Sequence, residues 1–170
     1  MQMVIKAFSN RGEEPLTVGV DPWGDTHLVP HLATLGIRYA PKAADCDRSS
    51  CDVSPNRVEF WCEADGYEVD LVLPSAFDRL LWDICVRGGC CGGLVDGVPT
   101  HVEGLLPEVG EVTAQAFVAL VSRAEGYAEG EGPSHDQRVW LEARFVDHMG
   151  AQSAPAATLR RNLRRPFDDA

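Results

Sequence analysis

The six cysteines are the residues whose type and spacing come closest to a recognisable chemistry. Cys46 and Cys51 are separated by four residues, as are Cys85 and Cys90, and Cys91 follows directly. Structural zinc sites take four ligands, which usually come in pairs about two to four residues apart. A zinc site built from Cys46, Cys51, Cys90 and Cys91 is therefore one hypothesis. The alternative, which we favour, is reduced thiols that pack as small apolar side chains, with no cofactor.

The segment 88–93 reads Gly-Gly-Cys-Cys-Gly-Gly and is a second candidate site. Successive glycines let backbone N–H groups converge, and such a nest can hold an anion or lower the pKa of a thiol. Asp96 and His101 follow shortly afterwards, so Cys90 or Cys91 could act as the nucleophile of a Cys-His-Asp set. We favour a simpler interpretation, a helix end and a tight turn, because closeness in sequence does not establish catalytic geometry.

The segment 41–55 is a third candidate, as a loop that binds a cation through Asp45, Asp47 and Asp52. Its start resembles an EF-hand calcium loop, but Ser50 replaces the required glycine and the bidentate glutamate is missing. A standard calcium site is therefore rejected, and a weak cation contact is the remaining hypothesis.

Trp23 lies in the turn-like sequence Asp-Pro-Trp-Gly-Asp, between two predicted strands. An aromatic side chain in such a turn serves either as a binding anchor or as a lid on the sheet edge. Asp25, His27 and His31 follow, but Pro30 opposes the helix on which two histidines four residues apart would share a metal. We therefore expect a solvent-exposed histidine pair here.

The net charge of −11 indicates what kind of partner the chain would attract. The stretch Asp45–Glu131 contains seventeen acidic residues and five arginines, whereas the rest of the chain is close to neutral. Such a field repels nucleic acids and anionic membranes and attracts basic proteins. The only basic cluster, Arg160–Arg165, is expected to pair with the protein's own carboxylates or with a second copy in a homo-oligomer.

These residues must be positioned by a β-rich first part and a helical second part. Strands are predicted over 3–8, 16–20 and 34–40, and a hairpin over 56–63 and 67–73 with an Asp-Gly turn between its strands. Helices are predicted to begin at the capping residues Ser75, Thr113 and Ser134, and a short helix is predicted over 155–164.

The expected fold class is α+β, with an N-terminal antiparallel β-rich half followed by three to four helices packed on the sheet. At 170 residues the chain fits one domain, residues 1–170, divided into a β-rich part (1–73), a helical part (74–150) and a C-terminal helix and tail (151–170). A boundary near Pro74 is the alternative.

No signal-peptide core or membrane-length apolar run is present, so a cytoplasmic location without membrane contact is expected. The two lysines stand against thirteen arginines, a bias that indicates a GC-rich bacterial genome.

The leading functional hypothesis is a non-enzymatic interaction domain that recognises a basic protein partner, of which a toxin-neutralising protein is one example. The absence of phosphate-binding, dinucleotide and nucleophile-elbow motifs leaves enzymatic activity open but disfavoured. The alternative is a metal- or thiol-dependent protein with its site at Cys46, Cys51, Cys90 and Cys91.

Overall fold

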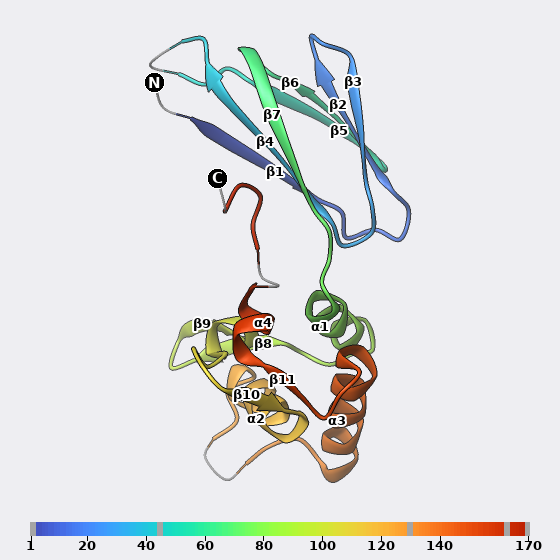
Figure 1. Cartoon of the computed structure of the whole chain (residues 1–170), viewed down its shortest axis with the longest axis vertical. Helices are drawn as coiled ribbons and strands as arrows, with labels where there is room; N and C mark the ends of the chain where they lie inside the picture. The colour runs from blue at the N-terminus through green and yellow to red at the C-terminus, as the bar shows by residue number, and fades with distance from the viewer. Residues whose placement is uncertain (1–2, 44–45, 129–130, 162–163, 169–170) are drawn as a thin grey trace. The chain divides into compact units, whose positions relative to one another are not determined.

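The computed structural model describes residues 3–43, 46–128, 131–161 and 164–168, and the chain forms two compact units (Figure 1). Unit 1 spans Met1–Pro74 and Arg164–Ala170, and unit 2 spans Ser75–Leu163. Strands dominate the first part of the chain and helices the second, so the predicted α+β class is confirmed. The first division between the units falls at Pro74, and each unit has its own hydrophobic core.

Unit 1 consists of two sheets. The first is antiparallel with the order β1-β4-β7, formed by Val4–Ser9, Thr34–Pro41 and Ala64–Val72. The second has the order β3-β2-β6-β5, formed by Asp25–Val29, Leu16–Asp21, Arg57–Trp61 and Ser50–Ser54. It is mixed because β2 and β6 run parallel. Strands β1 and β7 are the edges of the first sheet, and β3 and β5 are the edges of the second.

The core of unit 1 lies between these sheets and follows from the period-two alternation of apolar residues. Phe60 from β6 is fully buried, and its ring centroid lies 5.6 Å from that of Phe8 and 5.7 Å from that of Tyr39. Phe8 and Tyr39 belong to the first sheet, so these aromatic contacts join the two layers.

The predicted hairpin over 56–63 and 67–73 is wrong. Strand β6 pairs with β2 and β5, whereas β7 pairs with β4 in the other sheet. The Asp65-Gly66 pair that suggested a turn lies inside β7, and Gly66 does not have a positive φ. The true hairpin partner of β6 is β5, which lies in the segment 41–55 that the sequence suggested to be a loop.

Unit 2 contains the helices and two short antiparallel strand pairs. Its helices are α1 (Ala76–Val86), α2 (Ala114–Ala124), α3 (His135–Met149) and α4 (Ala156–Arg161), and η1 (Val102–Leu105) is a 3-10 turn. Strands β8 (Gly92–Val95) and β9 (Val98–His101) form a hairpin, and β10 (Glu111–Thr113) pairs antiparallel with the distant β11 (Ser153–Pro155). In the described part of the chain no helix is long and apolar enough to cross a membrane.

The three predicted helix starts are confirmed. Ser75 and Ser134 form capping boxes with Asp78 and Gln137, and the Thr113 hydroxyl accepts the N–H of Ala116. Each cap satisfies backbone donors that a helix start leaves unpaired. The apolar stripes of the helices then meet around Phe117, whose ring centroid lies 6.2 Å from Phe77 and 5.2 Å from Phe145.

The C-terminal segment 164–168 packs on the outer face of the β1-β4-β7 sheet. Asp70 of β7 accepts the Arg164 guanidinium and the Phe167 N–H, both at 2.8 Å, and Arg38 of β4 lies 4.5 Å from the Phe167 ring centroid. Gly36 makes room for this segment, because a Cβ there would lie 2.2 Å from the Cβ of Pro166. At least one arginine of the basic cluster therefore pairs with a carboxylate of the same chain.

Candidate functional site

The strongest cluster of exposed aromatic and charged side chains lies where the edge strands β3 and β7 face each other in unit 1. Trp23 belongs to the turn between β2 and β3, which is closed by a 3.0 Å hydrogen bond from the Gly24 N–H to the Val20 carbonyl. Gly24 has a φ of 73°, a conformation that favours glycine. The turn leaves the Trp23 side chain 39% exposed.

Asp25 and His27 follow on β3, on the face that points between the sheets. Their cross-strand partners on β2 are Val20 and Val18, both buried in the core. Opposed residues of an antiparallel pair share a face, so Asp25 and His27 point inward, although Asp25 stays exposed at the sheet edge. Alternation along Asp25-Thr26-His27 thus places the carboxylate and the imidazole together.

Tyr67 of β7 contacts all three of these residues. Its ring centroid lies 5.0 Å from Trp23, its hydroxyl donates a hydrogen bond to the Asp25 carboxylate, and His27 Nε2 lies 3.4 Å from the same hydroxyl. Because the Tyr67 proton is given to Asp25, the Tyr67 oxygen accepts from His27 Nε2–H. We call Trp23, Asp25, His27 and Tyr67 the edge site.

The electrostatics of the edge site favour binding over proton abstraction. Burial, followed by the hydrogen bond to Asp25 and its charge, raises the pKa of Tyr67 far above its ordinary value. Tyr67 is therefore a protonated donor at neutral pH and does not act as a base. It orients Asp25, whose carboxylate can accept further hydrogen bonds from a ligand.

Apolar surface continues along β7 beyond the edge site. Val69 and Leu71 pair with the buried residues Ile37 and Leu35, so they also point between the sheets, yet they are 43% and 40% exposed. In the described part of the chain, β3 and β7 each pair with one neighbour only, which leaves backbone donors and acceptors unpaired along both edges. An exposed indole, an oriented carboxylate and two strand edges can together hold an extended chain that carries a cationic group.

The other sequence-predicted residues of unit 1 do not join the edge site. Asp45 lies outside the described residues. Asp52 is exposed on β5, and Cys46 and Cys51 are exposed free thiols. Burial raises the pKa of Cys51, which keeps this thiol protonated at neutral pH.

Asp47 has a structural role in unit 1. Its carboxylate accepts the Tyr39 hydroxyl at 2.7 Å and the Ser49 N–H at 3.0 Å, and it forms an ion pair with Lys6 at 3.3 Å. Burial alone would raise the pKa of Asp47, but the hydrogen bonds from Tyr39, Ser49 and Lys6 outweigh it and lower the pKa to about 2. Asp47 thus holds the segment before β5 against β1 and β4.

Replacing Asp47 should remove a pH-dependent part of the stability of unit 1. The folded-state pKa lies below the unfolded one, so the contribution is complete above about pH 4 and is lost as the pH falls towards 2. We expect Asp47→Asn to lower the free energy of unfolding of unit 1 by about 2 kcal/mol at neutral pH and by much less near pH 2. Urea unfolding followed by unit 1 amide signals measures this, with Asp52→Asn as the exposed control. An equal loss at both pH values would contradict it.

The predicted Cys-His-Asp set does not assemble in unit 2. Asp96 and Gly97 have φ values of 52° and 78° and form the turn of the β8–β9 hairpin, where an Asp-Gly pair is favoured. His101 pairs with Gly92 across this hairpin, and among the described residues no hydrogen bond joins it to Cys90 or Cys91. The exposed Cys90 thiol donates to the Gly92 carbonyl, and Cys91 is buried.

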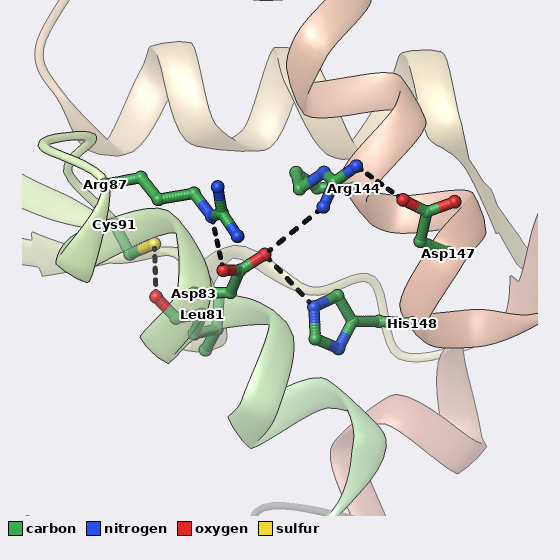
Figure 2. A network of polar contacts seen from close by, with 7 residues as sticks. All are labelled: Leu81, Asp83, Arg87, Cys91, Arg144, Asp147 and His148. Carbon is green, nitrogen blue, oxygen red and sulfur yellow. Dashed lines mark hydrogen bonds and ion pairs between the residues drawn. The ribbon is translucent and has the colours of Figure 1, made fainter.

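A polar network that the sequence did not reveal joins α1 to α3 in unit 2 (Figure 2). Asp83 of α1 contacts Arg87 Nε at 2.7 Å, His148 Nε2 at 3.3 Å and an Arg144 amino group at 3.8 Å. The hydrogen bond from Arg87, opposed by burial and assisted by His148, lowers the pKa of Asp83. Arg87 directly follows α1, and Arg144 and His148 lie on α3, which packs against α1, so this network, which we call the Asp83 clasp, ties the two helices together.

The structure also bears on the metal hypothesis. Among the described residues, no group of three or more histidine, cysteine, aspartate or glutamate side chains is arranged to hold a metal ion. Cys46 and Cys51 belong to unit 1, whereas Cys90 and Cys91 belong to unit 2.

Of the residues predicted for binding, the structure brings Trp23 into a cluster, and it adds His27, Asp25 and Tyr67 to it. The period-two spacing of Asp25 and His27 could have indicated their common face, but nothing local links them to Tyr67. Comparisons with family models, curated proteins and solved structures find no match to this chain.

Proposed function

We propose that this protein is a binding domain that recognises a basic protein partner, and that the edge site holds an arginine or lysine side chain of that partner. The observation that carries the proposal is the convergence of Trp23, Asp25 and His27 on the single side chain of Tyr67. A toxin-neutralising protein is one example of this class of function.

The chemistry of the edge site supports a cationic ligand. A guanidinium or ammonium group is attracted to an indole face within about 6 Å of the ring centroid. The Asp25 carboxylate, oriented by Tyr67 and exposed to solvent, supplies the opposite charge. Tryptophan and tyrosine are also the residues that most often carry binding energy at protein interfaces.

The surroundings of the edge site support an extended protein ligand. Residues 1–74 and 164–170 contain fourteen acidic and eight basic residues, so unit 1 attracts positive charge by itself. The β7 edge offers backbone hydrogen bonds, and the half-exposed Val69 and Leu71 offer apolar contacts for alternate side chains of an added strand.

A labelled hexa-arginine peptide is a suitable first probe, titrated into the full chain and followed by fluorescence anisotropy. We expect Asp25→Asn to weaken binding about fivefold, the effect of losing roughly 1 kcal/mol from a partly exposed charge pair. Asp52→Asn removes the same charge from an exposed position on β5 and should change the affinity by less than about twofold. Equal effects of the two variants would show that the peptide responds only to net charge, and the proposal would fail.

A further inference from the structure

We propose that Cys85 and Cys91 of unit 2 form a reversible, oxidisable thiol pair, which closes to a disulfide when the exposed Cys85 reacts with a hydroperoxide. This site is independent of the edge site and differs from the cysteine sets that the sequence suggested.

The end of α1 explains why these two cysteines meet. The chain turns back through Gly88, which has a φ of 85°, and the Gly89 N–H donates to the Ile84 carbonyl at 2.9 Å. The turn is so close to the helix that a Cβ on Gly89 would lie 2.7 Å from Ile84 Cγ2. The two glycines therefore return the following residues alongside the last turn of α1, from which Cys85 projects.

Cys91 lies directly against this last turn. Its thiol donates to the Leu81 carbonyl at 3.6 Å, as Figure 2 shows. Leu81 is four residues before Cys85, so its carbonyl also faces the helical position of Cys85. After burial, the neighbouring Cys85 thiol is the largest influence that raises the pKa of the Cys91 thiol, as expected for two side chains on the same helical turn and its returning chain. Cys90, although adjacent in sequence, is directed to the Gly92 carbonyl instead.

The two thiols differ in exposure, which gives each a separate role. Cys85 is exposed and accessible to an oxidant, whereas Cys91 is 8% exposed. Burial, followed by the neighbouring Cys85 and then Glu103, raises the pKa of this thiol well above its ordinary value. Cys91 is therefore protected from direct oxidation and serves as the resolving partner.

The chemistry balances with a hydroperoxide as the two-electron oxidant. The Cys85 thiolate attacks the peroxide, the O–O bond breaks, and Cys85 becomes a sulfenic acid while an alcohol or water leaves. Cys91 then loses its proton and attacks the Cys85 sulfur, the S–O bond breaks, and water is released as the S–S bond forms. Two thiols and one hydroperoxide give one disulfide, one alcohol or water, and one further water.

The Asp83 clasp holds the reacting turn in place. Arg87, two residues after Cys85, forms its ion pair with Asp83, which in turn contacts α3 (Figure 2). This anchoring keeps the end of α1 and the returning chain in a fixed relation. A thiol pair positioned in this way closes faster than one formed by random encounters.

To test the proposal, the reduced full chain is treated with a small excess of hydrogen peroxide, and the remaining thiols are then blocked with an alkylating agent. The disulfides are mapped by peptide mass spectrometry. We expect one disulfide, Cys85–Cys91, that a dithiol reductant reopens. Cys91→Ser should abolish it and leave a sulfenic acid on Cys85 that dimedone traps, whereas Cys90→Ser and Cys62→Ser should leave it intact.

Three results would each overturn the proposal. They are a disulfide between Cys90 and Cys91, a disulfide between Cys46 and Cys51 that forms in preference to Cys85–Cys91, and unchanged alkylation of Cys85 after peroxide treatment. Hydrogen exchange of the untreated variants confirms that they fold. If Cys91→Ser does not fold, the wild-type chain alone still tests the proposal, because mass spectrometry identifies directly which two cysteines form its disulfide.

Discussion

Trp23→Ala should weaken the binding of the hexa-arginine peptide about 30-fold or more, which corresponds to roughly 2 kcal/mol and to the loss of an interface anchor. The indole is 39% exposed and is supported from one side by Tyr67, so its other side is available to a guanidinium group. Its removal takes away both the cation–π contact and the apolar surface of the indole. The effect should persist at high salt better than that of Asp25→Asn, because salt screens exposed charges.

The chain offers a matched control for this variant. Trp61 of β6 is 51% exposed and belongs to the same unit, but it alternates with the buried Phe60 and points to the outer face of its sheet. Trp61→Ala should change the affinity by less than about twofold, as expected for a surface residue outside an interface. If Trp61→Ala and Trp23→Ala weaken binding equally, the edge site has no special role.

Phe117→Ala should destabilise unit 2 by about 3–5 kcal/mol, the usual cost of emptying a large aromatic site in a core. Phe117 is fully buried, and its ring packs against Phe77 of α1 and Phe145 of α3. Because the cores of the two units consist of separate sets of residues, the amides of unit 1 should keep their protection. Hydrogen exchange of the full chain, resolved by peptide, measures both units at once.

The reciprocal variant completes this experiment. Phe60→Ala empties the centre of the unit 1 core and should reduce the protection of its strands by a similar free energy, with unit 2 unaffected. Equal losses of protection in both units after either substitution would mean that the two cores unfold as one cooperative system. That result would contradict the division of the chain at Pro74 as an energetic boundary.

Local signals in the sequence predicted the helices well. Ser75, Thr113 and Ser134 were identified as caps because a cap depends on residues within one turn of it, and all three make the expected hydrogen bonds. The glycine at position 150 ends α3 in the left-handed conformation for the same local reason.

Pairing between distant strands could not be predicted in the same way. Two Asp-Gly pairs illustrate this: Asp96-Gly97 forms a hairpin turn, whereas Asp65-Gly66 lies inside β7. The same dipeptide adopts both structures because the strands that flank it, and the sheets that these strands join, decide between them. Strands β6 and β7 join different sheets, and the alternation of apolar residues along each strand does not indicate which sheet it joins.

The edge site was predictable only in part for the same reason. Trp23 stood out through its turn, but its partner Tyr67 is brought to it by the pairing of β7 with β4. The acidic stretch 45–131 is not a single surface region, because it crosses the boundary at Pro74 and contributes residues to both units. Charge in the sequence therefore suggests a class of partner, and the arrangement of the strands forms the edge site that we propose binds it.

The most direct test of the proposed function is an intermolecular nuclear Overhauser measurement on the full chain saturated with an isotope-labelled hexa-arginine peptide. We expect contacts between the arginine side-chain methylene protons and the ring protons of Trp23 and Tyr67, and none to the Trp61 ring. Contacts spread over the acidic surface, or confined to residues away from Trp23 and Asp25, would contradict it.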